Sequence, residues 1–162
     1  MKKIIFLLLP LMLLFSCSEQ KTKADTIKLS DELATKLKKK LSWEAYHKYC
    51  GEQNLKAPDN FEKLKGTVVT WKGEFSTYTV PKQPTALLPE LKVKMPNGGG
   101  VLSDVTLRVN GENRKIAEKL KIGDEILFKG KIMYLGSGMG DHVLILERLK
   151  YLPPQEPKKV VR

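Results

Sequence analysis

After residue 65 the chain repeatedly alternates apolar and polar residues with the two-residue period of a β-strand. The longest stretch, residues 66–80, is rich in Val, Thr, Trp, Phe and Tyr, and Gly73 in its middle indicates a β-bulge that bends the strand. Four shorter stretches follow, with these apolar members: Leu91, Val93 and Met95; Val105, Leu107 and Val109; Ile126, Phe128, Gly130, Ile132 and Tyr134; and the apolar residues of 143–152. Such a chain buries one face of a sheet, which predicts a mainly β domain.

A short helical stretch at residues 113–120 lies between the third and fourth of these strands. Five strands with a helix at that point are typical of the OB-fold, a small Greek-key barrel. A long, bent first strand suits the same fold, because a barrel of this size needs a strand that turns a corner. We therefore expect a mainly β chain with N-terminal helices, built on a five-stranded OB-fold-like barrel over residues 61–152, with a helix between strands 3 and 4.

Two helices are expected in a helical N-terminal segment over residues 29–60. The first carries an apolar stripe with Ser30 as its N-cap, and the stripe consists of Leu29, Leu33, Leu37 and Leu41. Ser42 caps a second short helix, whose apolar face consists of Trp43, Tyr46, Tyr49 and Cys50. Gly51 and Pro58 close the region. Residues 153–162 form a basic, proline-rich tail with no expected fold.

The start of the chain has the pattern of a secretory signal peptide. Two lysines precede an apolar run, residues 4–15, which is too short to span a bilayer as a helix. Leu14, Ser16 and Cys17 resemble the lipobox of bacterial lipoproteins, although Phe15 is larger than is usual there. The resemblance implies removal of residues 1–16, lipid on Cys17 and a flexible tether over residues 17–28. The alternatives are plain secretion and an uncleaved anchor.

That lipid would hold the protein to a membrane on the non-cytoplasmic side of a bacterial cell envelope. Loss of residues 1–16 lowers the formal net charge from +11 to +9, and a basic surface favours anionic partners. A solvated lysine-rich surface is the alternative, and export argues against nucleic acid as the natural ligand.

With Cys17 lipidated, Cys50 is the one remaining cysteine and has no partner for an intramolecular disulfide. We interpret Cys50 as a small buried apolar residue, and the alternatives are a free thiol or an intermolecular partner.

Two longer stretches resemble the C-terminal lumenal domain of wolframin. In residues 41–51 and 64–75 the shared pattern consists of Leu41, Ser42, Trp43, Tyr49, Cys50, Gly66, Val69, Trp71, Gly73 and Phe75. Residues 104–108, 120–128 and 144–147 resemble later strands of the same domain, so the resemblance spans residues 41–152. It implies an OB-fold without catalytic residues that binds or interacts on the non-cytoplasmic side. This chain lacks the transmembrane helices and extra cysteines of that family.

We find no pattern that favours an enzyme. His47 and His142 are isolated, and His142 is expected to be solvated in a turn. Asp104 and Asp124 are interpreted as turn acids, and the glycines of 136–140 lack the Lys-Ser/Thr of a phosphate-binding loop. Two cysteines and two histidines scattered along the chain do not favour a zinc site. We therefore predict no catalytic residue, metal or cofactor.

The outward face of the sheet offers a candidate ligand site. OB-folds bind on strands 2 and 3 and on the loops that join strands 1–2 and 4–5. If the apolar residues of those strands face inward, a basic face points outward, consisting of Lys72, Lys92, Lys94, Thr106, Arg108 and Lys131. The expected function is a non-enzymatic, lipid-anchored envelope protein that binds a protein or an anionic envelope component. The alternative is an OB-fold binder of nucleic acid or another anionic polymer, although strands 2 and 3 carry no outward aromatic residue for base stacking.

Overall fold

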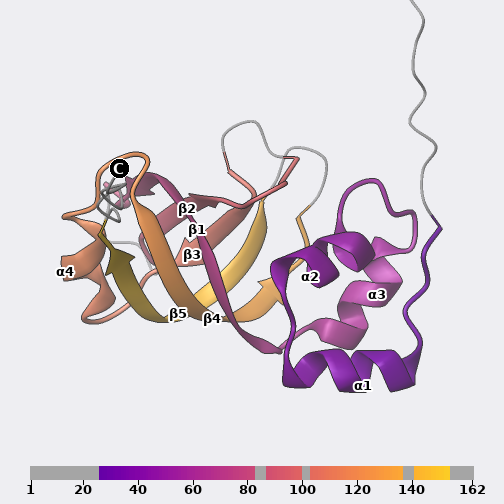
Figure 1. The fold of residues 1–162 in the computed structure, drawn as a ribbon. Helices are drawn as coiled ribbons and strands as arrows, with labels where there is room; N and C mark the ends of the chain where they lie inside the picture. The colour runs from indigo at the N-terminus through magenta and orange to yellow at the C-terminus, as the bar shows by residue number, and fades with distance from the viewer. Residues whose placement is uncertain (1–25, 83–86, 100–102, 137–140, 154–162) are drawn as a thin grey trace, which may run out of the picture.

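A computed structural model describes residues 26–82, 87–99, 103–136 and 141–153. In Figure 1 three helices lie at one end of a curved sheet, and a fourth helix lies at the opposite end. The elements in chain order are α1 (Asp31–Lys39), α2 (Trp43–Cys50), α3 (Ala57–Leu64), β1 (Val68–Thr79), β2 (Glu90–Lys94), β3 (Val105–Arg108), α4 (Asn113–Ala117), β4 (Glu125–Tyr134) and β5 (His142–Leu152).

The five strands form a mixed sheet that closes in a ring in the order β1-β2-β3-β5-β4. Neighbouring strands are antiparallel, except that β3 and β5 are parallel. The inside of the ring holds the alternating apolar residues, and those without exposed surface include Leu91, Val93, Val105, Leu107, Ile126, Phe128, Ile132, Leu144 and Leu146. The prediction of a mainly β chain with N-terminal helices, and a helix between the third and fourth strands, is confirmed.

Gly73 does not form the predicted bulge. It pairs with Ile126 inside an unbroken register between β1 and β4, and the register shift in β1 lies between Phe75 and Thr77. A Cβ on Gly73 would lie 2.5 Å from Cγ1 of Val93, so the strand needs glycine because β2 approaches it closely.

The caps of the first two helices are confirmed. The side chain of Ser30 accepts the backbone N–H of Leu33, and the side chain of Ser42 accepts that of Ala45. The expected leucine stripe is only partly buried: Leu29 and Leu41 are buried but flank α1, and Leu33 on the helix is 37% exposed. The helix α1 has nine residues, and Ala34 is its one buried residue, so α1 contributes little apolar surface to the core.

Pro58 opens a helix that was not expected from the sequence, and the expectation that it closes the helical region is wrong. It lies in the first turn of α3, where its missing N–H removes no helical hydrogen bond. The helix crosses the expected boundary between residues 60 and 61, and it buries Phe61 and Leu64 in the common core. The helical segment and the sheet therefore share one core.

Aromatic side chains fill the contact between α2 and the ring. The rings of Trp43 and Tyr46 lie 5.4 and 5.3 Å from that of Trp71, measured between centroids. The indole N–H of Trp71 donates to the carbonyl of Leu41 at 2.8 Å. Cys50 lies in the same core, 1% exposed, and burial raises the pKa of its thiol to about 12. The interpretation of Cys50 as a buried apolar residue is confirmed.

The expected signal peptide, Cys17, most of the expected tether and nearly all of the basic tail lie outside the described residues, as do residues 137–140 of the expected glycine-rich turn. Within the described part of the chain no helix is long and apolar enough to cross a membrane.

Candidate binding face on the outside of the sheet

Strand register places two rows of outward side chains next to each other across β2, β3, β5 and β4. We call these eight residues the outer platform. The first row consists of Lys92, Thr106, Val143 and Tyr134, and the second of Glu90, Arg108, Ile145 and Lys131. Because neighbouring strands lie about 5 Å apart, each row spans about 15 Å. The structure thus brings four of the predicted face residues together: Lys92, Thr106, Arg108 and Lys131.

Tyr134 was expected to point into the ring and instead lies on the outer platform, 49% exposed. The register between β4 and β5 shifts between Ile132 and Tyr134, which marks a β-bulge. A bulge adds one residue and so reverses the face to which the following side chain points. Ile132 still faces inward with no exposed surface, whereas Tyr134 faces outward.

Arg108 reaches across β5 to Tyr134. Its guanidinium carbon lies 5.4 Å from the centroid of the Tyr134 ring, within the range of a cation–π contact. Val143 and Ile145 lie between them in the register and are half-buried. The centre of the outer platform is therefore an apolar strip of β5 beneath a guanidinium and an aromatic ring.

Charges on the outer platform are only partly neutralised. Lys92 forms an ion pair with Asp141 at 3.5 Å. Neither Arg108 nor Lys131 forms an ion pair within the described part of the chain. A guanidinium with free N–H groups is able to bind a carboxylate or phosphate with two parallel hydrogen bonds.

Thr106 is not an available ligand group. It is 6% exposed, and its hydroxyl donates to Oδ2 of Asp141 at 2.7 Å. The hydroxyl of Ser103 donates to the same oxygen at 2.8 Å. These bonds fasten the start of β5 to β3, so the role of Thr106 is to hold the platform together rather than to contact a ligand.

The two remaining predicted face residues, Lys72 and Lys94, lie off the outer platform. Lys72 pairs with Glu125 at 2.7 Å on the side of the ring formed by β1 and β4. Lys94 lies at the end of β2, opposite Glu74. The basic face is therefore divided around the ring, and acidic side chains lie next to these two lysines.

His142 is buried, and the expectation of a solvated turn histidine is wrong. It is the first residue of β5, 6% exposed, and its Nδ1 lies 3.0 Å from the hydroxyl of Tyr46. The backbone N–H of Gly136 donates to the same nitrogen at 3.0 Å. Desolvation, reinforced by the nearby charge of His47, lowers the pKa of His142 to about 4, although Asp104 and Asp141 act against the shift. His142 is thus a neutral structural residue beneath the outer platform.

Asp104 and Asp124, both interpreted as turn acids, differ in the hydrogen bonds that they accept. Asp124 accepts the backbone N–H of Lys121 at 2.8 Å, as a turn acid does. Asp104 is 7% exposed, and its Oδ2 accepts the backbone N–H of Met95 at 2.7 Å, which ties β2 to the entry of β3. Within the residues that the structure describes, no group of three His, Cys, Asp or Glu side chains could hold a metal ion.

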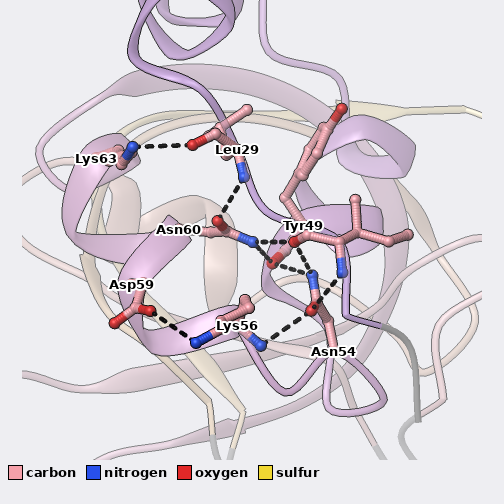
Figure 2. A network of polar contacts seen from close by, with 8 residues as sticks. Leu29, Tyr49, Asn54, Lys56, Asp59, Asn60 and Lys63 are labelled. Atoms are coloured by element: carbon pink, nitrogen blue, oxygen red, sulfur yellow. Dashed lines mark hydrogen bonds and ion pairs between the residues drawn. The ribbon is translucent and has the colours of Figure 1, made fainter.

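A second feature lies where the chain enters the fold. Figure 2 shows Asn54 and Asn60 holding the incoming segment, residues 27–29, against the helices. The side-chain oxygen of Asn60 accepts the N–H of Leu29 at 2.7 Å, and its amide donates to the carbonyls of Ile27 and Tyr49 at 2.7 and 2.8 Å. Asn54 bonds both the N–H and the carbonyl of Ile27, at 3.2 and 2.8 Å. We call this pair of buried asparagines the N-terminal clamp.

The sequence contained only a partial signal for the outer platform. Val143 to Leu146 form a continuous apolar run, which is typical of a strand with apolar residues on both faces, and this run indicates an apolar outer strip on β5. No local signal indicates that Tyr134 turns outward. The asparagines of the N-terminal clamp carry no signal either, because their partners lie up to 33 residues away.

Comparison of the chain with protein-family models finds no match, and comparison with curated proteins finds none either.

Proposed function

We propose that this protein is a non-enzymatic, lipid-anchored envelope protein whose OB-fold-like domain binds an anionic partner on the outer platform. The strand order β1-β2-β3-β5-β4, with α4 between β3 and β4, supports the OB-fold-like part of the proposal. The outer face of strands 2 and 3, where OB-folds bind ligands, is continuous with the outer platform.

The observation that carries the binding proposal is the contact of Arg108 with Tyr134. A cation–π pair on an exposed surface contributes only about 0.5–1 kcal/mol to stability, so the fold gains little from it. The pair nevertheless leaves guanidinium N–H groups and a half-exposed ring beside the half-buried Val143 and Ile145. Charge-assisted hydrogen bonds together with apolar area suit an anionic ligand that also carries an apolar or planar part.

The proposed anchor agrees with the way the chain enters the fold. A lipid on Cys17 would attach the tether to the membrane, and Thr26 and Ile27 are the first residues of the tether that the structure describes. The N-terminal clamp bonds Ile27 on both its N–H and its carbonyl. Such a fixed attachment point suits a tethered domain, because it holds the first residues of the fold against the helices.

The alternative is an OB-fold binder of nucleic acid or another anionic polymer. Single-stranded binders stack successive bases on several aromatic side chains. The outward side chains of β2 and β3 include no aromatic residue, and Tyr134 gives the outer platform a single ring. One ring supports contact with one planar group rather than with a run of bases, so we favour an envelope component.

A photo-crosslinking amino acid at position 143, between Arg108 and Tyr134, tests the proposal in the lipidated protein in its own envelope. We expect a specific crosslinked product that is weakened by Arg108→Ala. The same amino acid at position 55, an exposed site on the helical side, provides the control. Equal crosslinking from both positions, or none from position 143, would count against binding on the outer platform.

A further inference from the structure

The end of the ring opposite α1–α3 carries a second distinctive surface (Figure 1). There α4 and the turn that follows it enclose an open hollow of about 470 Å³. Its lining consists of Lys115, Ile116, Lys119, Leu120, Lys121, Asp124 and Tyr151. We call this surface, together with Ile122, the α4 end.

The α4 end is basic at its rim and apolar at its floor. Lys115, Lys119 and Lys121 are exposed, and none of them forms an ion pair within the described residues. The acid in the lining, Asp124, accepts the backbone N–H of Lys121 rather than pairing with a lysine ammonium. Ile116, Leu120 and Tyr151 provide the apolar surface.

Ile122 projects from this end and is 81% exposed, the highest value among the exposed large apolar residues of the described chain. The next residue, Gly123, has a φ of +91°, which turns the chain back toward β4. The turn is fixed to β1, because the N–H of Gly123 donates to the carbonyl of Phe75 at 3.0 Å and the N–H of Phe75 donates to the carbonyl of Asp124 at 2.8 Å. Ile122 therefore stands at the tip of a turn that is fixed to β1 through the two residues that follow it.

We propose that the α4 end binds the surface of an anionic lipid bilayer. Lysines next to an anionic membrane are attracted to its headgroups, while an apolar side chain and a tyrosine lie favourably at the boundary of headgroups and acyl chains. A small anionic molecule in the hollow would leave Ile122 in water. A bilayer accepts the projecting Ile122 and the three lysines at the same time.

This contact is separate from the outer platform and from the proposed lipid on Cys17. Thr26, where the described chain begins, joins the helical segment, whereas the α4 end lies across the ring from that segment (Figure 1). A domain that is tethered at one side and bound through the other lies along the membrane instead of swinging on its tether.

The test is sedimentation of the unlipidated chain, residues 18–162, with vesicles of phosphatidylcholine alone or mixed with phosphatidylglycerol. This chain retains every described residue but has neither signal peptide nor Cys17. We expect binding to the anionic vesicles only. Each lysine near an anionic surface contributes about a fivefold change in affinity, so K119E/K121E should weaken binding at least about tenfold. Ile122→Asp should weaken it at least about fivefold, because it removes an inserted apolar group.

Matched controls separate position from net charge. K38E/K40E changes the charge by the same amount at two exposed lysines of the helical segment, and Leu55→Asp changes a 68% exposed apolar residue on the helical side. Both controls should bind as the wild type does. Equal losses in K119E/K121E and K38E/K40E would overturn the proposal, as would wild-type binding that is the same for neutral and anionic vesicles. None of these outcomes depends on Arg108 or Tyr134, so failure here would leave the proposed function standing.

Discussion

The hydroxyl of Tyr46 on α2 lies 3.0 Å from Nδ1 of His142 on β5, a contact that joins residues 96 positions apart. Because the N–H of Gly136 also donates to Nδ1, this nitrogen carries no proton, so the hydroxyl of Tyr46 donates and the imidazole proton lies on Nε2. The residue after His142 is Val143 of the outer platform. The contact therefore ties the helical segment to the strand that forms the centre of the outer platform.

The first prediction concerns pH. In the unfolded chain His142 titrates near its ordinary pKa of 6.5, whereas burial lowers its native pKa to about 4. Between these values the unfolded state binds a proton that the native state does not, so stability is highest above pH 6.5 and falls as the pH is lowered toward 4. The free energy of unfolding should drop by about 2 kcal/mol from roughly pH 7 to pH 5. Urea unfolding at a series of pH values measures it.

Because carboxylates also titrate at the acid end, the informative comparison is with His142→Gln. This variant retains an acceptor for Tyr46 and Gly136 but cannot be protonated in this range. Its unfolding free energy should be nearly constant where that of the wild type falls. An unchanged slope in His142→Gln would show that other groups cause the pH dependence.

The second prediction concerns the N-terminal clamp. Asn60→Ala removes the acceptor of the Leu29 N–H, and Leu29 is completely buried. A buried donor without a partner costs about 1–3 kcal/mol, so unfolding should become easier by about 2 kcal/mol. Hydrogen exchange at the Leu29 amide should also accelerate. Asn113→Ala removes a similar bond from the N–H of Leu149 at the other side of the ring, and it should leave exchange at Leu29 unaltered.

The third prediction concerns the close approach of β1 and β2. Gly73→Ala places a Cβ 2.5 Å from Cγ1 of Val93 and 2.9 Å from the sulfur of Met95. Overpacking of this kind costs about 1–3 kcal/mol, and thermal unfolding should show the loss. Gly99→Ala, where no atom lies within 4 Å of the added Cβ, should unfold like the wild type. Partial recovery in the double variant G73A/V93A would identify the clash with Val93 as the cause.

Local features could be predicted from the sequence because their causes are local. Ser30 and Ser42 each cap a helix through a residue three positions later. The inward faces of the strands follow from a period of two, which holds for Leu91, Val93, Val105 and Leu107. These local patterns predicted the helices α1, α2 and α4, and they predicted which residues of β2 and β3 point into the ring.

The errors arose where a distant partner decides the outcome. A glycine in a strand suits either a bulge or a close approach, and only the position of Val93 decides between them for Gly73. The bulge before Tyr134 turns this ring outward, and the contact with Tyr46 buries His142. Thr106 does face outward as expected, but Asp141 covers it from the next strand. Half of the candidate site was therefore predicted, and its aromatic and apolar centre was not.

The central claim is that the outer platform binds an anionic partner through Arg108. The most direct measurement compares Arg108→Glu with Lys94→Glu, because both reverse one positive charge on the outer face of the sheet, but only Arg108 lies on the platform. Each purified variant is titrated with the component that the wild-type protein captures from its envelope. We predict that Arg108→Glu lowers affinity at least about tenfold, the effect of about 1.4 kcal/mol, while Lys94→Glu binds as the wild type does. Equal affinities in the two variants would contradict the account.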